Sequence, residues 1–309
     1  MEPDFSTPAK TLKTYRAGFV GMECDLEDVD NLLGELKHPV FGAAAYELSG
    51  SGEGKLALLY KAIQKHDPSF GYDERQTTGD CVSHSTRNAV DVTRCHEILN
   101  GEREEWVARG AVEAIYGSRG HGGQGMSCSV ASRFVHQNGG ILLRKDYGFV
   151  DLSKYNSKIG TKWGRTGVPS EVKKEAKKHQ VKTISNIRTV EEARDAIANG
   201  YAISVCSGYG FSSRRNSNGI SSRSGGWAHA MAWVAMDDTH EVYKETLFLV
   251  QNSWGVWNGG GKMHDQPDGS FWIREKDARG MLSGGGAWVY SDVDGFPARK
   301  VEWTLDEVF

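Results

Sequence analysis

Three residues in this chain form a candidate site for acyl transfer: Cys81, His229 and Asn252. A thiol is a nucleophile, an imidazole can take its proton, and a side-chain amide can orient the imidazole. Cys81 follows Gly-Asp and precedes a stretch with helical periodicity, so we expect it in the first turn of a helix. The dipole and free N–H groups of that turn favour a thiolate. The sequence therefore predicts a cysteine hydrolase.

A hydrolase of this kind also needs donors for the negative oxygen of the tetrahedral intermediate. Gln76 lies shortly before Cys81 in the sequence Gln-Thr-Thr-Gly-Asp-Cys. Its side-chain amide, together with the N–H groups of the first helical turn, is the candidate oxyanion hole.

His229 and Asn252 lie on two segments that we expect to be neighbouring strands. The connection centres on residues 240 and 241, and a tight hairpin there would oppose residues whose numbers sum to 481. His229 and Asn252 satisfy this sum, so we expect a direct cross-strand pair within hydrogen-bond reach. Trp254 would then cover that hydrogen bond and exclude water.

Each of these residues also has an ordinary structural interpretation. A cysteine at a helix start is usually just buried, a histidine on a strand is usually a hydrogen-bonded core residue, and an asparagine before Ser-Trp-Gly can form a turn. Only the combination favours catalysis. Metal binding by Cys81 and His84, three positions apart on a helix, is a further alternative, but two ligands are too few for a structural zinc site.

The elements that must position these residues differ between the two halves of the chain. Helical periodicity dominates the first half and strand patterns the second, which is typical of an α+β protein with two lobes. We expect helices over residues 26–36, 55–65, 82–100, 104–116, 127–138, 170–179 and 190–199, and strands over 181–184, 201–206, 228–236, 246–251, 271–274 and 287–291. The polar segment 212–224 is expected to be a mobile loop.

The bulk composition excludes several classes of protein. The 37 basic and 40 acidic residues give a net charge of −3, which provides no general attraction to nucleic acid or to a membrane surface. No apolar run approaches the ~18 residues of a spanning helix, and the N-terminus lacks the pattern of a secretion signal. We therefore expect a soluble, cytoplasmic protein.

The five cysteines have irregular spacings that fit neither a zinc site nor a redox motif. So few cysteines in so long a chain favour a reducing compartment. Cys95, Cys128 and Cys206 lie in apolar segments and are expected to be small buried hydrophobic residues.

Several of these motifs resemble those of the papain family of cysteine peptidases, over about residues 70 to 295. The matching segments are Gln76 to Cys81, Ala228-His229-Ala230, and Gln-Asn252-Ser-Trp254-Gly, and the Gly-Asp-Cys triplet is similar to that of the calpain branch. The resemblance implies an α+β papain-like fold with a helical lobe, an antiparallel β-barrel-like lobe and the site in the cleft between them. It implies a peptidase without a cofactor or a catalytic metal.

The same resemblance implies roles for residues around the triad. Gly122 and Gly123 match the loop whose backbone pairs with an extended peptide or protein substrate. Trp227 and Ala230 flank the histidine where the family forms its substrate pocket, and Trp227 would narrow that pocket or serve only in packing. Trp254 matches the residue that shields the triad.

We expect residues 71–165 to form the helical lobe and residues 166–309 the β-rich lobe with the C-terminal tail. Residues 1–70 lack the helical signature of the usual propeptide. This N-terminal extension is expected to be an inhibitory segment, an additional structural element, or a docking surface for assembly partners.

Three departures from the family pattern favour a different function as the alternative. Only four residues separate Gln76 from Cys81, the bulky Trp227 lies two positions before His229, and the Asp80 carboxylate opposes thiolate formation unless it caps the helix. The alternative is a catalytically weak or inactive papain-like module that serves as a structural or binding component of an assembly such as a viral particle.

Overall fold

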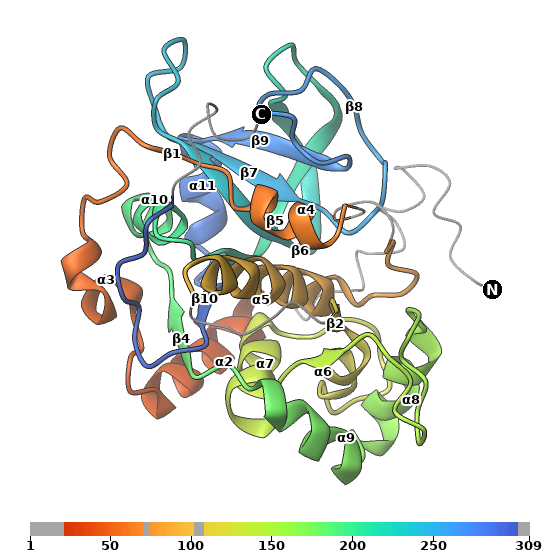
Figure 1. Cartoon of the computed structure of the whole chain (residues 1–309). Coiled ribbons are helices and arrows are strands. Elements are labelled where there is room, and N and C mark those ends of the chain that lie inside the picture. The colour runs from red at the N-terminus through yellow and green to blue at the C-terminus, as the bar shows by residue number, and fades with distance from the viewer. Residues whose placement is uncertain (1–21, 69, 71–73, 102–107, 302–309) are drawn as a thin grey trace.

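The structure is a computed structural model, which describes residues 22–301 apart from 69, 71–73 and 102–107. A long central helix, α5 (Cys81–Leu99), separates an antiparallel sheet from a group of shorter helices (Figure 1). The sequence forms this helix because it contains neither glycine nor proline between Cys81 and Leu99, and because Gly101, with a φ of +76°, ends it. The nucleophile candidate is thus the first residue of the central helix.

Residues 81–97 of α5 are buried on every face, although many of them are polar. Their charges are therefore paired. Arg87 lies 2.7 Å from Glu74, and Arg94 lies 3.1 Å from Asp91. This network fixes the helix that carries Cys81.

The helical side of the molecule consists of short elements that pack around α5. They are α6 (Glu113–Gly117), α7 (Cys128–Arg133) with a π turn η2 (Phe134–Asn138), α8 (Ser157–Thr166), α9 (Ser170–Ala176) with η3 (Lys177–His179), and the pair of strands β2 (Gly110–Ala111) and β3 (Leu142–Leu143). The expected helices 127–138 and 170–179 are confirmed. The helix α8 is an element that the sequence patterns missed.

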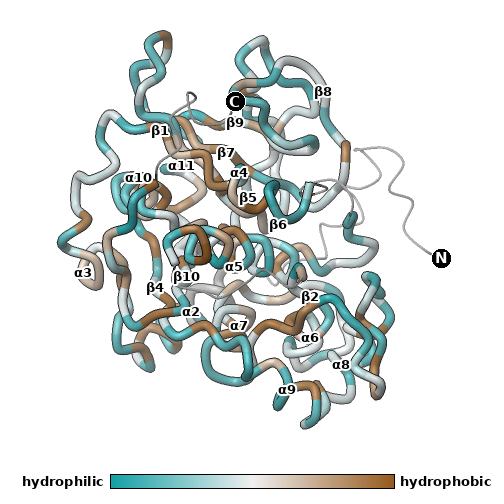
Figure 2. The backbone as a smooth tube through the Cα atoms, viewed as in Figure 1, coloured by the Kyte–Doolittle hydropathy of each residue, from teal (hydrophilic) through white to brown (hydrophobic). Residues whose placement is uncertain are grey.

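The sheet has the strand order β4-β10-β5-β6-β7-β9, and neighbours along this path are antiparallel. The strands are β4 (Thr183–Asn186), β5 (Ile203–Arg215), β6 (Ser221–Asp237), β7 (Leu247–Gln251), β9 (Ser270–Arg274) and β10 (Ala287–Ser291). Two short strands join it, β1 (Leu56–Ala57) on β6 and β8 (Gly259–Gly260) on β5. Hydrophobic residues gather along β7, and hydrophilic residues on the outer loops (Figure 2).

Two helices complete the β-rich side, α10 (Val190–Ala198) and α11 (Glu275–Leu282). α10 begins at a capping box in which the Thr189 side chain accepts from the Glu192 N–H and Glu192 reaches back to the Thr189 N–H. This local signal explains why the expected helix 190–199 is confirmed. The other, α11, was not anticipated.

The described part of the N-terminal segment is built into the body of the protein. α2 (Met22–Glu35) packs against α7, and Glu35 forms an ion pair of 3.0 Å with Arg133. After α3 (Phe41–Ala44) and the turn η1 (Tyr46–Leu48), β1 joins the sheet and α4 (Tyr60–His66) packs against α5. Leu32, Leu59 and Ile63 are fully buried. Residues 28–66 thus contribute to the core.

Three of the expected elements differ in the structure. The helix over 55–65 is confirmed in its second half as α4, but its first half contains β1, because Leu56 and Ala57 pair with the end of β6. The helix over 104–116 is replaced by β2 and the short α6 in its described part, while 102–107 lie outside the described residues. The expected loop 212–224 is the tip of the β5–β6 hairpin, whose backbone pairing tolerates small polar side chains.

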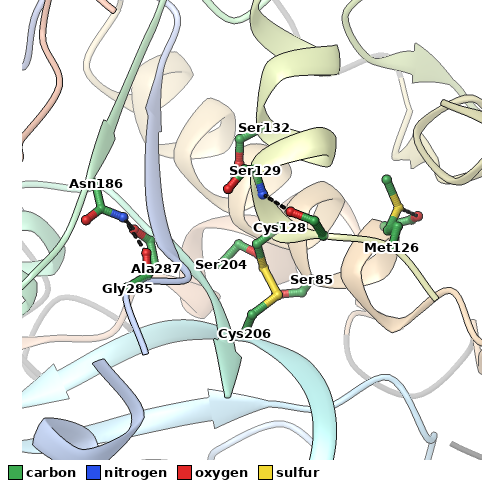
Figure 3. The surroundings of a disulfide bond; sticks show 12 residues. Ser85, Met126, Cys128, Ser129, Ser132, Asn186, Ser204, Cys206, Gly285 and Ala287 are labelled. Atoms are coloured by element: carbon green, nitrogen blue, oxygen red, sulfur yellow. Dashed lines mark hydrogen bonds between the residues drawn. A yellow bond between two sulfur atoms is a disulfide. The ribbon is translucent and has the colours of Figure 1, made fainter. Parts of the chain in front are cut away.

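Cys128 and Cys206 are buried, as expected, but they are not merely small hydrophobic residues. They form a disulfide between the start of α7 and β5, with Cα atoms 6.2 Å apart (Figure 3). The bond closes a sequence separation of 78 residues, which no local pattern reveals. Cys81 and Cys95 are free and buried. Because disulfides persist in oxidising compartments, this bond argues against the reducing compartment that the cysteine count suggested.

The helices of the described part of the chain are all too short or too polar to cross a bilayer.

Candidate active site

The Cys81 sulfur lies where the first turn of α5 meets β6. The backbone N–H of Ala230, the residue after His229, acts on the Cys81 thiol and favours its thiolate form, as do the N–H groups of Cys81 itself and Val82. The thiol therefore lies near the strand segment that carries the histidine. Ala230 is 1% exposed, so it acts on the site through its backbone and does not form a pocket surface.

His229 and Asn252 are in direct contact, as expected. The Nε2 atom of His229 lies 2.8 Å from the Oδ1 atom of Asn252, and both residues are buried. The same Oδ1 atom accepts the backbone N–H of Ser253 at 2.7 Å. Because a carbonyl oxygen only accepts, the proton of His229 belongs on Nε2, and Nδ1 is left as the basic nitrogen.

The strand register that led to this pair is nevertheless wrong. β6 and β7 pair Ala232 with Gln251 and Trp233 with Val250, and the register shifts before Ala235. Asn252 is therefore offset by two positions from direct opposition to His229. An offset of two keeps both side chains on one face, so the contact forms diagonally.

Trp254, in the bend after β7, lies next to His229. Their ring centroids are 4.6 Å apart, with an angle of 31° between the planes. Trp227 and Trp257 pack on Trp254, with centroids 4.8 and 5.4 Å away. Trp227 is 4% exposed, so it belongs to this aromatic cluster, which favours the packing interpretation over that of a residue narrowing an open pocket. The cluster covers the His229–Asn252 pair.

Gln76 is held beside the same pair. Its backbone N–H donates to the Ser253 carbonyl at 3.0 Å, and its Oε1 accepts the Ser253 hydroxyl. One Nε2 proton is donated to the Thr78 carbonyl at 2.9 Å. An amide NH₂ carries a second proton, which is the one that can serve an oxyanion. Despite the shortened loop, Gln76 is tied to the residue after Asn252.

Asp80 occupies the N-cap position of α5, but its side chain does not cap the helix. Its carboxylate accepts the Tyr155 hydroxyl at 2.7 Å and lies 3.6 Å from His84 Nε2. The Asp80 carboxylate next to Cys81 is therefore bound by Tyr155 and does not cap the helix. Tyr155 and Ser253 are site residues that sequence reasoning missed; Ser253 adjoins a motif, whereas nothing near Tyr155 signals its role.

The two central groups both favour their neutral forms. Burial raises the pKa of the Cys81 thiol to about 12; the Ala230 N–H opposes this increase, and the Asp80 charge adds to it. Burial lowers the pKa of His229 to about 4, against the hydrogen bond to Asn252. In this form of the protein, the expected effect of the helix N-terminus on the thiol is outweighed by desolvation.

Gly122 and Gly123 are exposed, in a loop that is hydrogen-bonded to the segment before Cys81. The Gly125 N–H donates to the Gly79 carbonyl at 3.0 Å, and Arg119 Nε donates to the Gly123 carbonyl at 3.0 Å. The two glycines thus present backbone on the surface next to residues 76–80.

The metal alternative gains no support from the position of His84. Its two ring nitrogens face the carboxylates of Glu74, at 3.9 Å, and Asp80, at 3.6 Å. Within the described residues, no group of three ligating side chains could hold an ion.

Comparison with known proteins identifies the fold. The sequence matches no protein-family model and no curated protein. Among solved structures, xylellain, a cysteine protease from Xylella fastidiosa, is similar with a TM-score of 0.54, 16% identity, and coverage of 79% of this chain and 89% of that chain. The ragweed pollen cysteine protease Amb a 11, in its proform, gives a TM-score of 0.55, 13% identity, and coverage of 93% and 77%.

A third similar structure is procathepsin B S9 from Trypanosoma congolense, with a TM-score of 0.55, 11% identity, and coverage of 93% of this chain and 91% of that chain. The similarity extends over most of each protein, including both the helices around α5 and the sheet. The chain therefore has the two-lobe α+β fold of papain-like cysteine peptidases.

Proposed function

We propose that this protein hydrolyses peptide bonds through a Cys81–His229–Asn252 triad. The observation that carries the proposal is the 2.8 Å contact between His229 Nε2 and Asn252 Oδ1. The effect of the Ala230 backbone, next to His229, on the Cys81 thiol supports it. In the proposal, α5 supplies the nucleophile, β6 the base, and the residue after β7 the orienting amide.

In the proposed reaction, Cys81 attacks the substrate carbonyl while His229 Nδ1 takes the thiol proton. The oxyanion that forms is stabilised by Gln76 Nε2 and the Cys81 N–H. His229 then gives its proton to the leaving amine, and a thioester remains on Cys81. Water, deprotonated by His229, hydrolyses the thioester and restores the thiol.

The pKa directions fit a resting state in which the proton is on sulfur. Burial raises the pKa of the Cys81 thiol and lowers that of the His229 imidazole, so both directions favour the neutral forms. We therefore infer that His229 acts as a general base during attack, in place of a thiolate–imidazolium pair formed beforehand.

Residues 28–66 are better explained as part of the fold than as a removable inhibitory segment. Leu59 and Ile63 are fully buried, and β1 pairs with β6, the strand that carries His229. Removing this segment would expose a large part of the core.

The alternative is a catalytically weak or inactive papain-like module that serves in an assembly, with residues 1–70 as a docking surface. It is favoured by the complete burial of Cys81 and His229. Hydrolysis of an unfolded protein, followed by mass spectrometry of the fragments, distinguishes the two. The proposal expects cleavage by the wild type and none by Cys81→Ala or His229→Ala. Equal cleavage by Cys81→Ala, or none by folded wild type, supports the alternative.

A further inference from the structure

The exposed face of α8 carries a row of positive charges. Lys158, Lys162 and Arg165 are all exposed and follow a spacing of four and three residues, which places them on one side of the helix. The opposite side is buried through Gly160, Trp163 and Gly164. We call Lys158, Lys162 and Arg165 the cationic face.

α8 packs beside α6 on the helical side of the molecule (Figure 1), and its two ends lie next to the loops that contain Thr77 and Gly122. At its start, the Ser157 hydroxyl lies 2.9 Å from that of Thr77, in the nucleophile loop. At its end, a Cβ atom placed on Gly122 would lie 3.1 Å from Cγ and 3.3 Å from Nε of Arg165. The cationic face thus runs along the edge of the site from Thr77 to Gly122.

The charges of this face are not neutralised by the described part of the protein. No described carboxylate forms an ion pair within 4.0 Å of Lys158, Lys162 or Arg165. Lys178, after α9, differs because it pairs with Glu175 at 2.8 Å. Glu171 lines the same hollow as Lys162 but makes no such pair.

Arg119 adds to the positive potential at the end of α8. It is 7% exposed, and its guanidinium donates to the carbonyls of Tyr116 at 2.7 Å and Gly160 at 3.0 Å, which do not cancel its charge. Burial lowers the pKa of Arg119; the Asp80 carboxylate opposes this decrease, and the positive charge of Arg165 adds to it.

We propose that the cationic face of α8 binds an acidic stretch of the peptide or protein substrate, next to the bond that is cleaved. The inference rests on the proposed function, because the bound peptide is taken to be the substrate of hydrolysis. The binding of an acidic peptide to α8 does not itself require that the peptide be cleaved. Lys158 and Lys162 are separated along the helix by about 6 Å. Alternate residues of an extended chain are about 7 Å apart and point to one side. Aspartate or glutamate at alternate positions of the substrate therefore matches the face.

The test compares two peptides that are identical except that two alternate Glu residues in one are Gln in the other. For wild type at low salt, kcat/KM for the acidic peptide is expected to be about tenfold higher, and the ratio should fall as salt increases. Lys158→Glu/Lys162→Glu should abolish or invert the ratio, and Lys158→Gln/Lys162→Gln should reduce it. Arg165 is retained because its stem packs on Gly122.

The matched control is Lys177→Glu/Lys276→Glu, which changes the net charge equally at exposed positions on η3 and α11. It should keep the wild-type ratio. Thermal unfolding of each variant verifies the fold. A wild-type ratio of one, or a ratio that survives charge reversal on α8, overturns the inference.

Binding of the same fluorescent peptides to the Cys81→Ala protein separates this inference from the proposed hydrolysis. If the acidic peptide binds more tightly and charge reversal on α8 removes this difference, the cationic face is supported. If wild type then cleaves neither peptide, only the proposed hydrolysis is refuted. Cleavage without charge preference refutes only the cationic face.

Discussion

His229 and Asn252 meet diagonally across β6 and the end of β7, with Nε2 and Oδ1 2.8 Å apart beneath the ring of Trp254. The contact fixes which imidazole nitrogen carries the proton and leaves Nδ1 as the base. The neighbours of this pair act on the rest of the site: the backbone of Ala230 favours the thiolate form of Cys81, and the Ser253 hydroxyl donates a hydrogen bond to Gln76.

Replacing the orienting amide should impair catalysis more than folding. Asn252→Ala removes the acceptor of the His229 proton, so we expect kcat/KM to fall by about 10- to 100-fold. The variant also leaves the buried Nε2–H of His229 without its acceptor, which should reduce the free energy of unfolding by about 1–3 kcal/mol. Kinetics and urea unfolding measure the two effects. Asn199→Ala, which removes a buried amide at the end of α10, should affect only stability. Equal kinetic losses in both variants would contradict the orienting role.

Neutralising the charge beside the nucleophile should make the thiol more acidic. Asp80 raises the pKa of Cys81, and Asp80→Asn removes this charge while an amide oxygen can still accept from Tyr155. We expect the alkylation of Cys81 near pH 7 to accelerate by roughly threefold or more. The rate is measured by peptide mass spectrometry across pH, with Cys95 as an internal control. A slower alkylation of the Asp80→Asn variant would contradict this prediction and show that the contacts of Asp80 matter more for the thiol than its charge.

Acid should destabilise the protein partly through His229. Its pKa is about 6.5 when unfolded and about 4 in the folded protein, so the unfolded chain binds the proton first as the pH falls. Stability is therefore unaffected above about pH 6.5 and is lost progressively down to about pH 4, by an amount on the order of 3 kcal/mol. Urea unfolding of wild type and His229→Gln at pH 7, 5 and 4 isolates the effect. Parallel losses in both proteins would assign the acid sensitivity to other groups.

The disulfide should contribute substantially to stability because it crosslinks distant segments. Cys128 and Cys206 are 78 residues apart in sequence, and their bond ties α7 to β5. Cys128→Ala/Cys206→Ala should lower the free energy of unfolding by about 2–5 kcal/mol. Reductant should lower the Tm of wild type and leave that of the double variant unchanged. Detection of all five cysteines as free thiols in oxidised, unfolded wild type would refute the bond.

Sequence patterns anticipated the elements whose signals are local. α5 begins after Gly-Asp and ends at Asn-Gly, and α10 has a capping box, so both could be predicted. The His229–Asn252 contact was anticipated even though the register was wrong by two residues, because a shift of two keeps side chains on the same face.

The features that were missed depend on distant segments. Tyr155 reaches Asp80 across 75 residues, and Cys128 reaches Cys206 across 78. Local sequence periodicity cannot predict contacts between residues so far apart in the chain. Strand β1 was mistaken for helix because Leu56 and Ala57 are extended only by pairing with β6. Burial of Cys81, which raises its pKa, is also a property of the assembled fold.

The most direct test of the central claim is to trap the acyl group on the nucleophile. Wild type is mixed with an activated ester of a blocked peptide, quenched in acid and analysed by peptide mass spectrometry. The account predicts a thioester on Cys81, none on Cys95, and much slower acylation in His229→Ala. Absence of an adduct on Cys81 in folded protein, or equal acylation without His229, would contradict it.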